Sequence, residues 1–312
     1  MKNIQILLST YNGEKYLKAQ LDSFVRLENF ESIKILIRDD GSKDGTLAIL
    51  DEYSEKYGFE IIKGENIGLN ASMHELIKAR DKSCKYFSFS DQDDVWLPSK
   101  VKRGIDALAN YDNEPVLYAA CSTLVDVELN PFGHLKIPKR PLSFYNAMIE
   151  NVTAGHTQIC NEKMMNIIAS TYSEDVVIFD HFIYLISAAA GKVIYDEECT
   201  TLYRQHGNNV VGYRSSFFGR LKIQIRAILK ADVCKKSTKQ LDGFVRRCEN
   251  ASAPEYLKEA KRFLKAQRNF FTRLGYVFTS KFYRQSKLET PITNLMYLLG
   301  MYKIKTKRST HK

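Results

Sequence analysis

The first 110 residues alternate short apolar runs with stretches in which apolar side chains recur at helical spacing. Each apolar run is typical of a buried strand, and each periodic stretch is typical of an amphipathic helix. The predicted strands are 4–9, 33–37, 59–62 and 86–90, and the predicted helices are 16–24, 46–57, 70–79 and 98–108. Repeated strand–helix units predict an α/β fold with a mostly parallel central sheet flanked by helices.

The pattern becomes mixed from 117 to 203 and then largely helical. Strands are predicted at 117–124, 157–160 and 192–195, and helices at 162–170 and 180–190. Beyond the polar, Gly-containing turn at 207–212, the chain is helical, basic and aromatic. We therefore expect a catalytic domain over 1–212 and a basic, mainly helical C-terminal region over 213–312.

Charge divides the chain at the same place. The net charge is +10, but residues 211–312 hold 24 Lys and Arg against 6 Asp and Glu, whereas the first 210 residues have a net charge of −8. The second part therefore suits an anionic partner. Because the apolar pattern starts at Ile4, we expect no signal peptide, and no apolar run approaches about 20 residues. With six dispersed cysteines expected to be reduced thiols, the compartment we expect is the cytoplasm.

Polar motifs follow the predicted strands at the point where each strand ends. They are Thr10-Tyr11-Asn12, Asp39-Asp40-Gly41-Ser42, Asn66-Ile67-Gly68 and Asp91-Gln92-Asp93-Asp94. Ligands of open α/β sheets bind beyond the carboxyl ends of the strands, so these loops predict one site. Clustered carboxylates are the oxygen ligands that Mg²⁺ and Mn²⁺ prefer, usually together with substrate phosphates. The site therefore favours a substrate that carries a diphosphate.

The order and spacing of these motifs resemble those of family 2 glycosyltransferases, the inverting enzymes of GT-A fold. Asp180-His181 and Tyr203-Arg204-Gln205-His206-Gly207-Asn208-Asn209 extend the resemblance, which covers about residues 1–212. Within the family, the chain looks closest to the rhamnosyltransferase-like enzymes that build bacterial surface polysaccharides. The resemblance implies transfer of a sugar from a nucleotide diphosphate donor, with Mn²⁺ or Mg²⁺ as cofactor.

The resemblance also implies roles for single residues. Asp39 accepts the imide N–H of uracil or thymine, Asp93 binds the metal, and Asp91 faces the ribose or sugar as a second metal candidate. His206 completes the metal shell or contacts the diphosphate. The other residues expected at the donor are Thr10, Tyr11, Asn12, Asp40, Asn66, Gly68, Asn70 and Gln92, and the expected acceptor-side wall comprises Asp94, His156, His181, Arg204 and His206.

Inversion requires a carboxylate to take the proton of the acceptor hydroxyl. The family's base lies on a later loop or helix start, and Asp180 matches that position, with Glu174 and Asp175 as nearby competitors. Asp180 at the start of a predicted helix is also suited to capping, and the two roles are compatible.

The C-terminal region combines aromatic, aliphatic and basic side chains at 217–230, 263–283 and 296–308. Helices of this kind lie on anionic membranes, so we expect a peripheral enzyme on the inner face of the cell membrane that acts on a lipid-linked saccharide. The alternatives are a solvated helical subdomain with its own core and a homodimer interface.

We expect dTDP-L-rhamnose as the donor. A glucosyl, galactosyl or N-acetylhexosaminyl transferase that uses a UDP-sugar has the same machinery. A nucleic-acid-binding protein fits the basic tail but leaves the acidic motifs unexplained, so we expect no nucleic acid partner.

Overall fold

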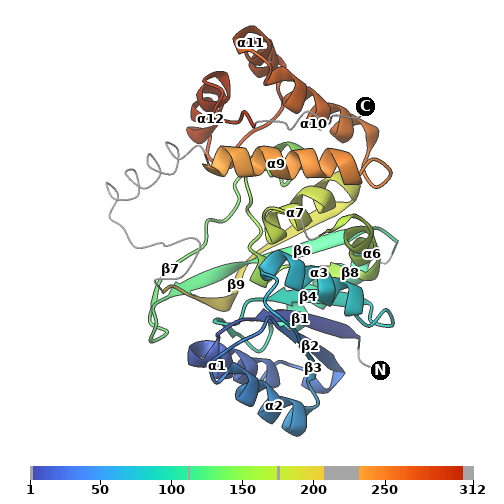
Figure 1. The fold of residues 1–312 in the computed structure, drawn as a ribbon, viewed down its shortest axis with the longest axis vertical. Coiled ribbons are helices and arrows are strands. Elements are labelled where there is room, and N and C mark those ends of the chain that lie inside the picture. Colours follow the sequence, from blue (N-terminus) through green and yellow to red (C-terminus); the bar gives the residue numbers. More distant parts are fainter. Residues whose placement is uncertain (1–2, 112, 174–175, 207–231, 305–312) are drawn as a thin grey trace.

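The computed structural model describes residues 3–111, 113–173, 176–206 and 232–304, and within these ranges a nine-stranded sheet runs through the molecule (Figure 1). Its order is β3-β2-β1-β4-β8-β6-β9-β5, and β7 pairs with β6 beside this order. The first four strands in this order are parallel, β8 is antiparallel to both of its neighbours, and β6 and β9 are again parallel. The strands are β1 (Ile4–Thr10), β2 (Ile33–Asp39), β3 (Glu60–Lys63), β4 (Tyr86–Ser90), β5 (Val95–Trp96), β6 (Val116–Val125), β7 (Pro131–His134), β8 (Ile159–Asn161) and β9 (Lys192–Arg204).

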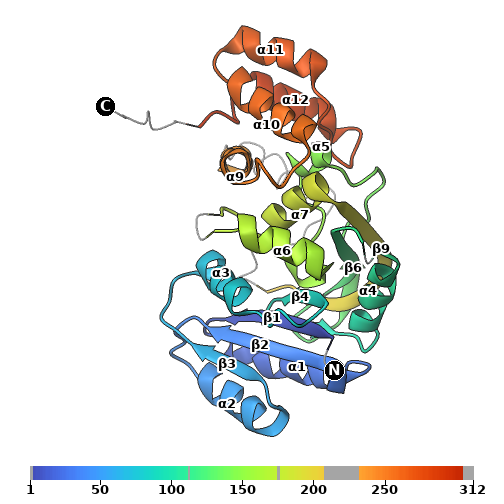
Figure 2. The same ribbon diagram turned by 90° about the vertical axis from the view of Figure 1, so that its right-hand side faces the viewer.

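Helices cover both faces of this sheet because side chains alternate along each strand. Ile6 and Leu8 of β1 pack with α1, α2 and α4, whereas Leu7 between them packs with α3, α6 and α7. Figure 2 shows α1 and α2 on one side of β1–β3 and α3 on the other. The bounds are α1 (Glu14–Val25), α2 (Thr46–Tyr57), α3 (Leu69–Ala79), α4 (Lys100–Leu108), α5 (Phe144–Ala147), α6 (Glu162–Thr171) and α7 (Phe179–Ala190), with short 3-10 turns η1 (Phe30–Ser32), η2 (Ala109–Tyr111) and η3 (Gly155–Thr157).

The C-terminal helices lie at the far end of the molecule from α2 (Figure 1). They are α9 (Asp232–Arg247), α10 (Pro254–Ala266), α11 (Phe270–Thr279) and α12 (Glu289–Leu298). Phe244 of α9 packs against Phe144 of α5 with ring centroids 5.2 Å apart, and Arg284 forms an ion pair with the largely buried carboxylate of Glu150 at 3.0 Å. These helices therefore share one hydrophobic core with α5–α7.

The predicted alternation of strands and helices over the first 110 residues is confirmed. Two later strand predictions needed correction. The segment 157–160 begins in η3 and becomes a strand only at Ile159, and the strand predicted at 192–195 continues as β9 to Arg204. The short elements β5, β7 and α5 were not predicted from the sequence. The predicted boundary at 207–212 and the aromatic-basic stretch 217–230 lie outside the described residues.

Two further observations concern the cysteines and the helices of the described ranges. None of the six cysteines, all within the described ranges, forms a disulfide bond, as predicted. Within the described ranges, no helix is both long enough and apolar enough to cross a bilayer.

Candidate nucleotide-sugar site

The ends of three parallel strands coincide at one edge of the sheet. Thr10 at the end of β1 pairs with Asp39 at the end of β2, and Asp39 pairs in turn with Lys63 at the end of β3. On the other side of β1, Leu8 pairs with Ser90, which directly precedes the acidic loop. The predicted convergence of the strand-end motifs on one edge is thus a consequence of sheet register.

Asp39 organises the loop that follows β2. Its carboxylate accepts hydrogen bonds from the hydroxyls of Thr10 (3.1 Å) and Ser42 (2.5 Å), and from the backbone N–H groups of Gly41 (3.1 Å) and Ser42 (2.9 Å). The residue is only 1% exposed. A nucleobase N–H would therefore have to replace one of the two hydroxyl donors. Contact between Asp39 and the base stays a prediction.

Asp40 joins the second strand to the loop after β3. Its carboxylate pairs with the buried guanidinium of Arg38 and accepts the backbone N–H groups of Ile67 (3.0 Å) and Gly68 (2.8 Å). Gly68 adopts a φ of +82°, a conformation that favours glycine. Asp40 is buried as well, so its charge shapes the Asn66–Gly68 loop, in which Asn66 is exposed.

Gln92 links the acidic loop to the loop after β1. Its amide oxygen accepts the N–H of Tyr11 (2.9 Å), and its amide nitrogen donates to the carbonyl of the same residue (3.1 Å). The backbone N–H of Asn12, at φ +46°, donates to the Ser42 hydroxyl oxygen at 2.9 Å, and the Asn12 side-chain oxygen accepts the backbone N–H of Lys43 at 2.9 Å. Tyr11 remains exposed beside this frame, and its side chain is available to a ligand.

Asn70, in the first turn of α3, fastens a segment from the second half of the chain. Its side-chain amide donates to the carbonyl of Val176 at 2.6 Å, and its own carbonyl accepts the hydroxyl of Tyr172 at 3.2 Å. The residue was predicted to contact the donor. In the structure it holds the segment that leads into α7, which carries Asp180.

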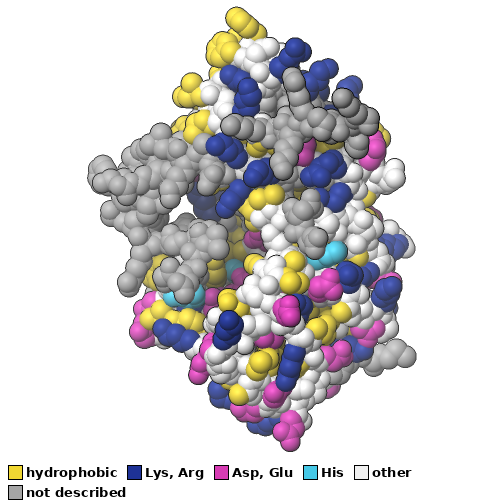
Figure 3. All heavy atoms as spheres, viewed as in Figure 1, with side chains coloured by type: hydrophobic (Ala, Val, Ile, Leu, Met, Phe, Trp, Pro, Cys, Tyr) yellow, Lys and Arg dark blue, Asp and Glu magenta, His cyan; other side chains and the backbone are white. Residues whose placement is uncertain are grey.

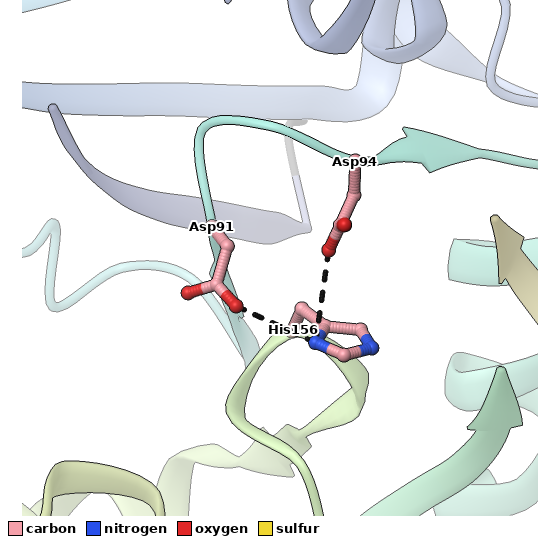
Figure 4. A group of neighbouring side chains, drawn as sticks. All are labelled: Asp91, Asp94 and His156. Atoms are coloured by element: carbon pink, nitrogen blue, oxygen red, sulfur yellow. Dashed lines mark ion pairs between the residues drawn. The ribbon is translucent and has the colours of Figure 1, made fainter. Parts of the chain in front are cut away.

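The acidic loop between β4 and β5 directs two carboxylates toward one imidazole (Figure 4). His156, from η3, places Nδ1 3.4 Å from Asp91 Oδ2 and 3.6 Å from Asp94 Oδ2, and the Ser122 hydroxyl lies 2.9 Å from its Nε2. Asp94 is fully buried, and the backbone N–H of Arg204 donates to its Oδ1 at 3.1 Å. Burial, followed by the charges of Asp93 and Asp91, raises the pKa of Asp94 well above its ordinary value.

Asp93 turns to a different imidazole. His206 Nε2 lies 2.7 Å from Asp93 Oδ2, and the His206 ring stacks on Tyr16 of α1 at 5.1 Å. Arg204 donates to the backbone carbonyl of Asp93 at 2.9 Å and lies over the same Tyr16 ring. Burial and the charge of Asp91 raise the pKa of the Asp93 carboxyl. The structure therefore brings together the loop 91–94 and the end of β9, as the motif order predicted.

A divalent cation fits this set of side chains. Ligand atoms of Asp91, Asp94 and His156 lie within 4.8 Å of one another, and Asp94 Oδ2 is buried without a hydrogen-bond partner within the described ranges. Burial and then repulsion from neighbouring carboxylates raise the pKa values of Asp93 and Asp94, and a bound cation would stabilise their charged forms. Sequence analysis assigned the metal to Asp93, Asp91 and His206. The structure adds Asp94 and His156 to the candidates.

Asp180 lies in the first turn of α7, within electrostatic range of Asp91. Its carboxylate accepts the backbone N–H groups of His181 (2.7 Å) and Gly155 (3.3 Å). Burial, followed by the charge of Asp91, raises the pKa of the Asp180 carboxyl to about 6. A carboxylate whose pKa lies near neutrality is suited to accept a proton. The competing bases Glu174 and Asp175 lie outside the described residues.

His181 shows a different environment from the one predicted. Its ring is buried and bonded through Nε2 to the carbonyl of Ala147 at 2.7 Å, and burial lowers its pKa. This geometry gives no support to its predicted place in the acceptor-side wall, and it indicates that the ring ties α7 to α5.

Sequence reasoning missed one charged residue beneath the site. Lys100, at the start of α4, is fully buried, and its ammonium lies 4.5 Å from the ring centroid of Trp96. Burial lowers its pKa to about 7, against the opposing influence of Asp94. Trp96 itself packs against Phe24 in the core, so it is not a wall of the site. No pattern in the sequence predicts that a lysine at the start of a helix is buried.

Fold and site together define a nucleotide-sugar-dependent transferase, and the comparisons with known proteins agree. The family model described as "Glycosyl transferase family 2" matches residues 5–165. The chain is 31% identical over 229 residues to the "dTDP-rhamnosyl transferase RfbG" of Shigella flexneri, which covers 69% of this chain and 77% of that protein.

Two solved structures share the fold. The S. aureus TarS fragment 1–349 in complex with UDP superposes with a TM-score of 0.56 at 14% identity, covering 96% of this chain and 80% of that chain. The Pyrobaculum calidifontis mannosyltransferase PcManGT, in complex with GDP-Man and Mn²⁺, superposes with a TM-score of 0.53 at 13% identity, covering 96% and 85%. The chain belongs to glycosyl transferase family 2, and the expected GT-A fold is confirmed.

Proposed function

We propose that this glycosyltransferase moves L-rhamnose from dTDP-rhamnose to a saccharide acceptor, with inversion at the anomeric carbon. The observation that carries the proposal is the position of Asp180, a carboxylate with a pKa near 6 within electrostatic range of the acidic loop. The similarity to a dTDP-rhamnosyl transferase supports the choice of donor. A lipid-linked saccharide is the acceptor we propose.

In the proposed reaction, Asp180 takes the proton of the acceptor hydroxyl as its oxygen attacks the anomeric carbon. The bond from that carbon to the diphosphate oxygen breaks on the opposite face, and the nucleoside diphosphate leaves with the bonding electron pair. Asp91 and Asp93 of the acidic loop, with Asp94 and the nearby imidazoles, would hold a Mn²⁺ or Mg²⁺ ion. When bound, such an ion neutralises the charge that develops on the diphosphate.

The remaining loops have supporting roles in this proposal. Asp39 and Gln92 set the backbone of the loops that flank the base and ribose, and Asp40 fixes the Asn66–Gly68 loop. Tyr11, exposed at the edge, is suited to contact the base. Specificity for thymine over uracil would depend on a contact with the 5-methyl group.

The donor is tested by thermal unfolding with a panel of nucleotide sugars, each with and without Mn²⁺. A ligand that binds the native state raises Tm, and a tighter ligand raises it more. We therefore expect a metal-dependent rise in Tm with dTDP-rhamnose that exceeds the rise with dTDP alone. A larger rise with UDP-glucose, UDP-galactose or a UDP-N-acetylhexosamine would replace rhamnose as the donor. The two structural neighbours were solved with UDP and GDP-Man, so the fold alone does not select the nucleotide.

A further inference from the structure

Helices α11 and α12 present a second apolar face to solvent. Phe271 is 80% exposed, Phe278 81% and Leu288 83%. Leu288, Ile292, Leu295 and Leu299 follow one another at intervals of three or four residues, so they share one side of α12. Figure 3 shows hydrophobic side chains gathered along the upper rim of the molecule, over α11 and α12. We call this surface, residues Phe271, Phe278, Leu288, Ile292, Leu295 and Leu299, the rim patch.

The rim patch is not required by the core of the C-terminal helices. The opposite sides of these helices already enclose an aromatic cluster in which Phe263 packs on Tyr276 and Tyr297 with ring centroids 5.9 Å and 4.8 Å apart. These aromatic side chains belong to the hydrophobic core that the C-terminal helices share with α5–α7. A soluble helix pair with one buried face normally presents a polar face to water, and a contiguous apolar one marks an interaction site.

Cations outnumber acids in the helices that carry the rim patch, although Lys261 pairs with Glu249 at 3.2 Å and Arg284 with Glu150 at 3.0 Å, both acids of earlier segments. Residues 254–304 contain ten Lys and Arg against three Asp and Glu. Two of the three acids are already paired, Glu259 with Arg262 at 2.7 Å and Glu289 with Arg284 at 2.8 Å. On α10, the side chains of Lys258, Lys261 and Lys265 line an open hollow of about 320 Å³. Lys and Arg side chains lie beside the hydrophobic rim in Figure 3.

We propose that the rim patch and its surrounding lysines dock on an anionic lipid bilayer. Such a bilayer satisfies both features at once, since the apolar side chains enter the acyl boundary while the cations contact headgroup phosphates. A two-fold dimer through the same face would bring the lysines of one subunit close to the same lysines of the other, and this like-charge repulsion is unfavourable. A nucleic acid would satisfy the lysines but offer no partner for the aliphatic side chains of α12.

The test is flotation of the full-length protein with two kinds of vesicle. One is neutral phosphatidylcholine, and the other contains in addition roughly 30% phosphatidylglycerol, which gives an anionic surface. We expect binding to the anionic vesicles and little to the neutral ones. No substrate is present, so the result is independent of the donor and the reaction.

Two variants separate the apolar from the charged contribution. F271S/F278S should lower the partition coefficient about 100-fold, because each side chain loses most of its transfer from water. K258Q/K261Q/K265Q should lower it by roughly fivefold per lysine on anionic vesicles only. F132S removes an exposed phenylalanine from β7, far along the chain from the patch, and should change nothing. Circular dichroism and Tm check that each variant is folded.

Three results would overturn the proposal. The first is that the wild-type protein does not float with anionic vesicles. The second is equal binding by wild type and F271S/F278S while both are folded. The third is a wild-type dimer in analytical ultracentrifugation that F271S/F278S converts to a monomer, which would assign the rim patch to a second copy of the chain.

Discussion

Replacing Asp180 by Asn tests both the chemistry and the electrostatics of the proposed base. Asn keeps the size of the side chain and the hydrogen bond from His181, but it cannot take a proton. General-base catalysis contributes about 10²–10⁴ in rate, so we expect kcat to fall by that factor, which corresponds to a rise of about 3–5 kcal/mol in activation free energy. The donor dissociation constant should change less than about threefold, since Asp180 acts on the acceptor.

The same substitution should stabilise the metal-free protein above pH 6. Raising the pKa of the carboxyl from 3.8 to about 6 corresponds to a cost of about 3 kcal/mol for the ionised form. This is an upper limit because the residue is partly exposed, and loss of the Gly155 hydrogen bond takes away about 1 kcal/mol. A net gain of about 1–2 kcal/mol should raise Tm by roughly 2–6 °C at pH 8.

The sign of the pH dependence follows from the direction of the pKa change. Between pH 3.8 and about 6, the folded state holds a proton on Asp180 that the unfolded state has lost, so wild-type stability falls as the pH rises through this window. Asp180→Asn lacks this contribution, and the two Tm curves should separate between pH 4 and 6 and stay parallel above. In activity, kcat/KM should fall on the acid side with an apparent pKa of about 6 or lower, because a cation at Asp91 lowers it.

The measurements are steady-state kinetics with the preferred donor, donor titration by calorimetry, and thermal unfolding from pH 4 to 8 with a chelator present. Asp175→Asn is the matched control, since Asp175 is a competing base five residues earlier. Full turnover by Asp180→Asn, or loss of turnover in Asp175→Asn instead, would refute the assignment of the base.

Three further outcomes are expected. Gln92→Ala should raise KM for the donor about tenfold with a smaller effect on kcat, because the Gln92 side chain bonds to both the N–H and the carbonyl of Tyr11. Gln92→Glu keeps one of these hydrogen bonds, so its KM should lie between the values of the wild type and Gln92→Ala. An unchanged KM in Gln92→Ala would contradict this role of the side chain. Asp40→Asn should destabilise the fold by about 3–5 kcal/mol in thermal or denaturant unfolding, since it leaves the buried guanidinium of Arg38 without its counter-charge. A chelator should abolish transfer, and Mn²⁺ or Mg²⁺ should restore it in the wild type but not in Asp93→Asn; activity that persists in the chelator would exclude an essential cation.

Much of the fold was predictable because it depends on local patterns. The apolar runs and helical spacing of the first 110 residues gave the strands and helices with small errors at their ends. The short elements β5, β7 and α5 were missed, because strands of a few residues carry no periodicity and are stabilised by their neighbours. Val95 and Trp96 form a strand only because β9, about 100 residues later, pairs with them.

The position of the site could be predicted from the sequence, whereas the roles of its individual residues could not. The strand-end motifs identified the edge and its acidic loop, and a resemblance to a family supplied the roles. Asp39 and Asp40 look equivalent in the sequence, yet Asp39 accepts four hydrogen bonds from its own loop and the neighbouring strand β1, and Asp40 pairs with Arg38. His181 was predicted in the acceptor-side wall as part of the Asp180-His181 motif of the family resemblance, and in the structure its ring bonds to the carbonyl of Ala147.

By itself, the sequence determined the strand–helix order, the edge at which the polar loops gather and the basic character of the C-terminal region. The tertiary structure alone decided which carboxylates are buried and which groups face them. Asp94 is enclosed by the backbone of Arg204, 110 residues away, and His156 reaches the acidic loop from η3. Burial and electrostatic environment depend on such distant contacts, because desolvation and Coulomb interactions act through space and leave no signature in the local sequence.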